Sequence, residues 1–154
     1  MITKEEVLAA QNKWGEGIVN IATLYREGKD YKTAAAEFAG SKYGFDEREV
    51  LFKPTKAAVI PFRHDLEGAI SYFIGGNEKY QEDQGFAIQP IVKVEFRNVG
   101  MVLKGQEAIS MGHYLFTDIN GGETLVEYTM CFYRSEDRSL KLFLHHSSFP
   151  FVQQ

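Results

Sequence analysis

The hydrophobic pattern changes along the chain from a period near 3.6 residues to a period of 2. In the first half, apolar residues recur at helical spacing in three segments, which predicts helices over residues 3–27, 30–39 and 65–74. Thr3 and Glu6 form a capping-box pattern at the start of the first helix. Each segment is followed by a glycine, the residue that most often ends a helix: Gly28, Gly40 and Gly75.

Strand patterns fill the second half of the chain. A short strand is predicted at residues 50–53, and Pro61 limits the apolar segment 57–62 to an edge strand or a turn. Alternation predicts long strands near residues 92–97, 107–117, 123–134 and 140–144, with a hairpin at Asn120-Gly-Gly122. Helices first and an antiparallel meander last predict one α+β domain over residues 1–154, with the helices on one face of the sheet.

The last strand ends in polar residues where the chain should leave a core. Because a strand alternates its side chains, one face should carry Lys141, Phe143, His145 and Ser147. The other face should carry His146 and a row of three leucines, Leu140, Leu142 and Leu144. An exposed leucine row would be a liability, so we expect a homodimer that covers this outer face.

Charge and composition narrow the class of protein. The net charge of −4 and the pI of about 5.6 argue against nucleic acid or an anionic membrane as partner. No apolar run approaches the length of a membrane span, and no secretory signal precedes the first helix. The single cysteine, Cys131, cannot form an intrachain disulfide. We expect a cytoplasmic protein, although a signal trimmed from ahead of Met1 would leave no trace.

Several kinds of catalytic site find little support. His145 and His146 point to opposite faces of a strand and cannot readily hold one ion together, so no metal site is predicted. Cys131 is typical of a small core residue, and the nucleophile-elbow motif of serine hydrolases is absent. Three carboxylates could act as a base but are more typical of caps, turns or surface positions: Asp65, Glu67 and Asp118.

A set of hydroxyl groups remains. Ser147 and His145 share one face of the last strand, Thr55 follows Pro54, and Tyr72 lies beside the apolar stripe of the third helix. Hydroxyls and an imidazole suit a small polar species such as water or a planar oxyanion. Phe143 would supply an apolar wall.

The sequence resembles the iota-class carbonic anhydrases, and the resemblance runs from about residue 5 to the end. It rests on five motifs, of which the first is the most specific: His145-His-Ser-Ser-Phe-Pro150, Tyr72-Phe-Ile-Gly-Gly76, Glu82-Asp-Gln-Gly-Phe86, Met111-Gly-His-Tyr-x-Phe-Thr117 and Val126-Glu-Tyr128. Their domain is similar to the association domain of calmodulin-dependent protein kinase. The element order likewise matches the nuclear-transport-factor-2-like (SnoaL-like) cone, in which helices pack on a curved antiparallel sheet.

The resemblance implies reversible hydration of CO2 to bicarbonate. In metal-free members of the family a Thr, a Tyr and a Ser hold bicarbonate or the reacting water, and the matching positions are Thr55, Tyr72 and Ser147. By strand parity His145 should face the same cavity. No cofactor is therefore expected, with Mn or Zn as the alternative because other members depend on manganese. An extra proline, Pro61, departs from the family pattern after Thr55.

Energetics predict a modest catalyst. Zinc lowers the pKa of bound water from about 15.7 to about 7, worth roughly 12 kcal/mol, and neutral hydroxyls cannot match that. Water must then lose its proton during attack, to His145 or to a solvent relay, and such general-base help contributes about 10²- to 10⁴-fold. Two alternatives of the same fold stay open on sequence alone: a non-catalytic oligomerisation module, and a cyclase, isomerase or binding protein for another small ligand.

Overall fold

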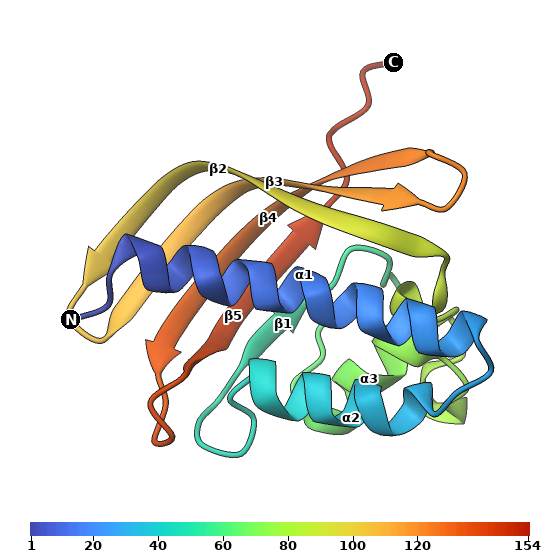
Figure 1. Ribbon diagram of the computed structural model, residues 1–154, viewed down its shortest axis with the longest axis horizontal. Coiled ribbons are helices and arrows are strands. Elements are labelled where there is room, and N and C mark those ends of the chain that lie inside the picture. The colour runs from blue at the N-terminus through green and yellow to red at the C-terminus, as the bar shows by residue number, and fades with distance from the viewer.

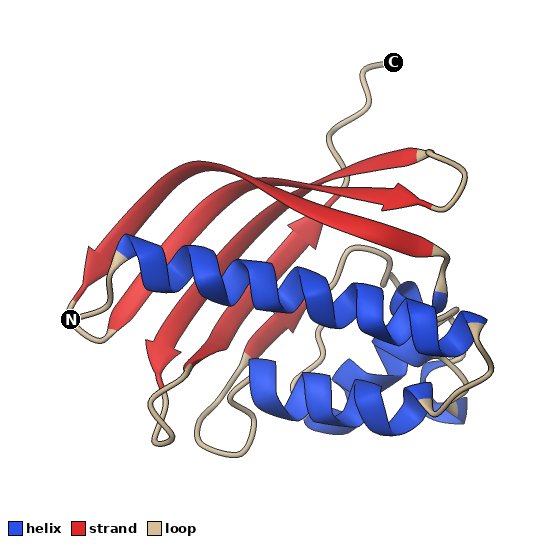
Figure 2. Ribbon diagram, viewed as in Figure 1, coloured by secondary structure: helices blue, strands red, loops and turns tan.

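A curved five-stranded sheet wraps around one long helix in the computed structural model, which describes residues 1–154 (Figure 1). The helices and strands, in chain order, are α1 (Lys4–Arg26), α2 (Tyr31–Lys42), β1 (Leu51–Lys53), α3 (Leu66–Ile74), the 3₁₀ turns η1 (Glu78–Tyr80) and η2 (Phe86–Ile88), β2 (Ile91–Lys104), β3 (Glu107–Asp118), β4 (Glu123–Arg134) and β5 (Leu140–Ser148). All helices lie on one side of the sheet (Figure 2). The α+β prediction is confirmed.

The strand order is β1-β5-β4-β3-β2, and only β1 and β5 run parallel. β2 to β5 form the expected meander, and β1 is added at the edge beside β5. This pairing places Phe52 of β1 directly beside His145 of β5. The loop that carries Thr55 therefore begins beside the C-terminal end of β5.

α1 begins with the predicted capping box. The Thr3 hydroxyl accepts from the Glu6 N–H at 3.2 Å, and the Glu6 carboxylate accepts from the Thr3 N–H at 2.9 Å. Its two glycines mark close packing: a Cβ on Gly15 would lie 3.1 Å from the Cβ of Val94, and one on Gly17 would overlap the Phe38 ring. α1 therefore sits deep in the concave face of the sheet, where it buries Trp14 and Ile18.

α2 continues past Gly40, where the sequence pattern predicted its end. The extra turn carries Tyr43 into the core, where it is fully buried, and its N–H donates to the Ala39 carbonyl at 3.1 Å. Burial of a tyrosine ring outweighs the roughly 1 kcal/mol that a helical glycine costs. The segment 57–62 forms no strand.

β5 does not alternate regularly, and the predicted faces are wrong for the residues before Leu144. The register shifts between Cys131, which pairs with Leu144, and Phe132, which pairs with Leu142, so Phe143 is an extra residue in β5. Such a bulge moves every side chain before it to the other face. Leu142 therefore lies in the core, 1 % exposed, on the same side as His145. The outer row of leucines does not exist.

Phe143 consequently lies outside the cone. Its ring packs under the Arg48 guanidinium at 4.3 Å and against Tyr133, with 6.0 Å between ring centroids. The expectation that Phe143 lines the site with His145 is wrong for this reason.

None of the helices has the length and apolar character needed to cross a membrane.

Candidate active site

His145 lies at the centre of a buried polar cluster between the sheet and the helices. Its Nδ1 is 2.7 Å from the Tyr43 hydroxyl, and its Nε2 is 3.0 Å from the Tyr114 hydroxyl and 3.1 Å from the Ser147 hydroxyl. Tyr114 and Ser147 are also hydrogen-bonded to each other. Both nitrogens of the imidazole thus have hydroxyl partners, although the side chain is only 2 % exposed.

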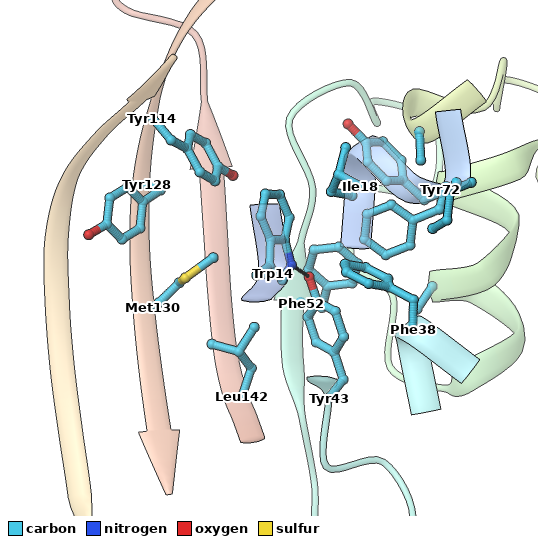
Figure 3. Packing of buried hydrophobic residues seen from close by; sticks show 14 of the residues in the cluster. Trp14, Ile18, Phe38, Tyr43, Phe52, Tyr72, Tyr114, Tyr128, Met130 and Leu142 are labelled. Carbon is cyan, nitrogen blue, oxygen red and sulfur yellow. Dashed lines mark hydrogen bonds between the residues drawn. The ribbon is translucent and has the colours of Figure 1, made fainter. Parts of the chain in front are cut away.

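Aromatic rings enclose this cluster. The Phe52 ring stacks on the imidazole of His145 with centroids 5.2 Å apart, and the Trp14 ring meets it edge-on at 5.6 Å. The indole N–H of Trp14 donates to the Tyr43 hydroxyl at 3.2 Å, an interaction visible in Figure 3. The rings exclude water, so polar groups inside depend on one another for hydrogen bonds.

Thr55 and Tyr72 complete the site from the helical side. The side chain of Thr55 lies near both phenols, where it acts to lower the pKa of Tyr72 and of Tyr114 against the larger opposing effect of burial. The Tyr72 oxygen also accepts the N–H of Lys56 at 3.1 Å. Thr55, Tyr72 and Ser147, far apart in the sequence, are therefore brought together through Tyr114. His145 joins them from the strand side.

The segment after Thr55 is held by a buried ion pair. Arg63 is 1 % exposed and makes two hydrogen bonds of 2.7 Å to the carboxylate of Asp83. The neighbouring Glu82 carboxylate accepts from three successive backbone N–H groups, those of Ala58, Val59 and Ile60. These hydrogen bonds fix the backbone of residues 58–63 on both sides of Pro61. The loop that carries Thr55 is therefore anchored at its C-terminal end.

Burial sets the protonation of the site. Desolvation raises the pKa of Tyr72 and of Tyr114 well above the usual phenol value, so both stay protonated at neutral pH. Desolvation, with a smaller contribution from the charge of His146, lowers the pKa of His145 to about 3. The site is therefore an assembly of neutral hydroxyls around a neutral imidazole, and His145 is a weak base. This argues against the expectation that His145 accepts the proton of water.

The other candidate residues take structural positions. His146 faces outward and is exposed, as predicted. Asp65 caps α3 by accepting the Gly68 N–H, Glu67 pairs with Lys79 at the surface, and Asp118 closes the β3–β4 turn. Nowhere does the structure bring together three or more His, Cys, Asp or Glu side chains that could hold a metal ion.

Sequence patterns alone missed three members of the cluster: Trp14, Tyr43 and Tyr114. Tyr114 lies within the motif Met111–Thr117, and its inward alternation on β3 was a usable signal. Trp14 and Tyr43 had none, because an indole at a core position of α1 and a tyrosine at the end of α2 are typical of ordinary packing.

Known proteins share both the sequence and the fold. The model of the family described as metal-independent carbonic anhydrase matches residues 5–149. A protein of Nostoc sp. strain PCC 7120 named metal-independent carbonic anhydrase is 41% identical over 156 residues, covering 99% of this chain and 76% of its own.

Among solved structures, a cyanobacterial iota-carbonic anhydrase in complex with bicarbonate superimposes with a TM-score of 0.96 at 38% identity, over 99% of this chain and 94% of that one. A protein described as a calcium/calmodulin-dependent protein kinase II association domain, from Xanthomonas campestris, shares the fold with a TM-score of 0.65 at 20% identity, over 99% of this chain and 91% of that one. The full-length match of sequence and fold places the chain in the family of metal-independent carbonic anhydrases.

Proposed function

We propose that this carbonic anhydrase interconverts CO2 and bicarbonate at the hydroxyl cluster formed by Thr55, Tyr72, Tyr114 and Ser147. The observation that carries the assignment is the convergence of four hydroxyls from four separate segments on one water-poor point beside His145. The bicarbonate bound by the cyanobacterial relative is a planar oxyanion of the size that such a cluster suits.

The hydroxyls would stabilise the negative charge that develops on the oxygens of CO2 when water attacks it. CO2 is neutral and accepts hydrogen bonds weakly, whereas the oxygens of the developing bicarbonate carry negative charge. Hydrogen bonds to charged groups are worth about 1.5–3 kcal/mol, more than those to neutral groups. Pre-positioned donors therefore stabilise the transition state more than bound CO2, which is the requirement for catalysis. The Tyr72 oxygen already accepts from Lys56, so its own hydrogen is free to donate.

The proton released by water would leave through solvent. His145 is a weak base at neutral pH because it is buried. Tyr72 lines a cavity of about 190 Å³ together with Lys56, Phe86 and Gln89. We assign this cavity as the route by which CO2 and water reach Tyr72 and by which the proton departs.

Removal of single hydroxyls tests the site. Ser147→Ala, Thr55→Val and Tyr72→Phe should each lower kcat/KM for CO2 hydration by about tenfold or more, since each loses a hydrogen bond to a charged oxygen. Double variants should lose less than the product of the single losses, because the groups act together. Hydration is followed by stopped flow with a pH indicator, and folding by circular dichroism.

The exposed neighbour His146 supplies the control, since His146→Ala should keep full turnover. Retention of full activity by both Tyr72→Phe and Ser147→Ala would show that the reaction occurs elsewhere.

The family's metal independence predicts that exhaustive chelation leaves kcat/KM unchanged. Loss of activity on chelation, restored by one equivalent of Mn²⁺ or Zn²⁺, would contradict it.

We further propose a cytoplasmic homodimer. The single cysteine, Cys131, is buried and unpaired, which suits a reducing compartment. With Leu140 and Leu142 of β5 turned inward, the exposed apolar residues of the outer sheet face include Val102, Ile109 and Met111, which we call the outer patch. Val102 pairs with Ile109 across β2 and β3, so the patch is continuous. A second copy of the chain would cover it.

A further inference from the structure

A hydrogen-bonded chain of fixed direction runs from α1 to the proposed site. It starts at the indole N–H of Trp14, which can only donate, and its acceptor is the Tyr43 hydroxyl. The second partner of that hydroxyl is Nδ1 of His145, at 2.7 Å. Tyr43 is fully buried, so its own hydrogen would be left without an acceptor unless it is donated to Nδ1. Nδ1 is therefore the acceptor in this pair.

The direction at Nδ1 determines the tautomer of His145. A neutral imidazole carries one hydrogen, and with Nδ1 accepting, that hydrogen lies on Nε2. Nε2 then donates toward Tyr114 and Ser147, at 3.0 and 3.1 Å. The imidazole is neutral because burial lowers its pKa to about 3.

The tautomer in turn fixes where the hydrogens of the two hydroxyls can point. Tyr114 and Ser147 have one hydroxyl hydrogen each, and the bond between them uses one of the two. The other cannot return to Nε2 of His145, because that nitrogen already carries a hydrogen and has no free lone pair. It must therefore point out of the triangle formed by Tyr114, Ser147 and His145. In the opposite tautomer, a bare Nε2 would accept this hydrogen instead.

We propose that Trp14 and Tyr43 are positioning residues that hold His145 in its Nε2–H tautomer and thereby make the Tyr114–Ser147 pair present one hydroxyl hydrogen to the substrate oxygen. The part that concerns the substrate rests on the proposed function. The tautomer itself rests on the hydrogen bonds of Tyr43 and on the burial of His145. Neither Trp14 nor Tyr43 touches substrate in this scheme, and both act through His145.

The tautomer can be measured without turnover. In protein labelled with ¹⁵N-histidine, long-range ¹H–¹⁵N correlation spectra distinguish a protonated from a bare ring nitrogen. The spectrum of His145→Gln identifies the signals of His145. We expect the Nε2–H tautomer in the wild-type protein throughout pH 5–9. An Nδ1–H tautomer or an imidazolium in this range would overturn the proposal even if every variant failed to fold.

Variants then test the link to catalysis. Tyr43→Phe removes the donor to Nδ1 and Trp14→Phe removes the group that orients Tyr43, so each should shift His145 toward a mixture of tautomers. Each should also lower kcat/KM by about tenfold, as expected for a lost hydrogen bond to a charged oxygen. Tyr133→Phe is the matched control, because the buried Tyr133 hydroxyl has no hydrogen-bond partner. It should change neither tautomer nor kcat/KM.

The outcomes separate this proposal from the assignment of the site. A mixed tautomer with wild-type kcat/KM in Tyr43→Phe would overturn the positioning role. Full activity of both Tyr72→Phe and Ser147→Ala would instead overturn the site, while the tautomer of His145 would still be read from the spectrum. A fall in kcat/KM in Tyr43→Phe with an unchanged Nε2–H tautomer would also overturn the positioning role, since the loss would then have a purely structural cause.

Discussion

At the scale of single residues, burial decides which chemistry the site can use. The same desolvation that keeps Tyr72 and Tyr114 protonated keeps His145 neutral. Such a cluster cannot generate hydroxide in advance, as a metal does, and works by orienting hydrogen-bond donors. Because the buried imidazole resists protonation in the folded state, the free energy of unfolding should depend on pH.

The pH dependence of stability should reveal His145. Its pKa is about 3 when folded and near 6.5 when unfolded, so between these values the unfolded chain binds a proton that the folded protein does not. The free energy of unfolding should therefore be fully retained above pH 6.5 and fall as the pH drops toward 3, by up to about 5 kcal/mol. Urea unfolding at half-unit steps between pH 4.5 and 7 measures this slope while most carboxylates remain ionised.

Two glutamine variants make the assignment specific. His145→Gln removes the titrating group and should flatten the slope, whatever it does to the stability itself. His146→Gln, at the exposed neighbouring position, should leave the slope as in the wild type. An unchanged slope in His145→Gln would mean that another group produces it.

At the scale of elements, the position of Thr55 depends on a loop rather than on a helix or strand. The loop leaves β1 at Lys53 and returns to α3 through Arg63, whose backbone N–H donates to the Phe52 carbonyl at 2.7 Å. The carboxylate of Asp83 binds Arg63 and also accepts from the Ser71 hydroxyl of α3 at 2.6 Å. One buried carboxylate thus joins the loop to the helix that carries Tyr72.

Asp83→Asn should disturb both stability and catalysis. It removes the charged partner of both 2.7 Å hydrogen bonds and leaves only the Glu82 carboxylate, 3.8 Å away, as counter-charge for the buried Arg63 guanidinium. The loss of one partner of a buried pair costs about 3–5 kcal/mol. We expect a lower midpoint of urea unfolding and a fall in kcat/KM, because Thr55 and Tyr72 are no longer held together. Glu67→Gln is the control: its pair with Lys79 is exposed and should be worth less than about 1 kcal/mol. Equal effects of the two variants would contradict the role of the buried pair.

At the scale of the whole molecule, the sheet has one face covered by helices and one left open (Figure 1). On the open face Val102 is 59%, Ile109 44% and Met111 57% exposed. A contiguous apolar patch on a sheet face is typical of a protein–protein interface. The concave face holds the proposed site, so pairing through the outer patch would leave the cavity beside Tyr72 open.

Charge on the outer patch should therefore separate the protomers. Ile109→Lys or Met111→Glu would place charges of one sign opposite each other across a two-fold interface. Sedimentation velocity at micromolar concentration should give a dimer for the wild type and a monomer for either variant. Val59→Lys, at a loop position that is 80% exposed, should remain dimeric. A monomeric wild-type protein would contradict the proposal.

Short-range patterns in the amino-acid sequence were enough to predict the local features of this structure. The capping box at Thr3, the cap at Asp65, the meander from β2 to β5 and the opposite directions of His145 and His146 all follow from periods of 3.6 and 2 and from local hydrogen bonds. The family motifs added Thr55, Tyr72 and Ser147, which chain order alone could not connect.

The remaining features depend on contacts between residues far apart in the sequence, so local patterns could not predict them. The bulge at Phe143 arises from pairing with β4, and it sends that ring outside and Leu142 into the core. The roles proposed for Tyr43 and Trp14 depend on contacts with His145, 102 residues beyond Tyr43. Sequence periodicity reports which side chains are buried, whereas the hydrogen-bond partners of a buried group are determined by the packing of α1, α2 and β5 against one another.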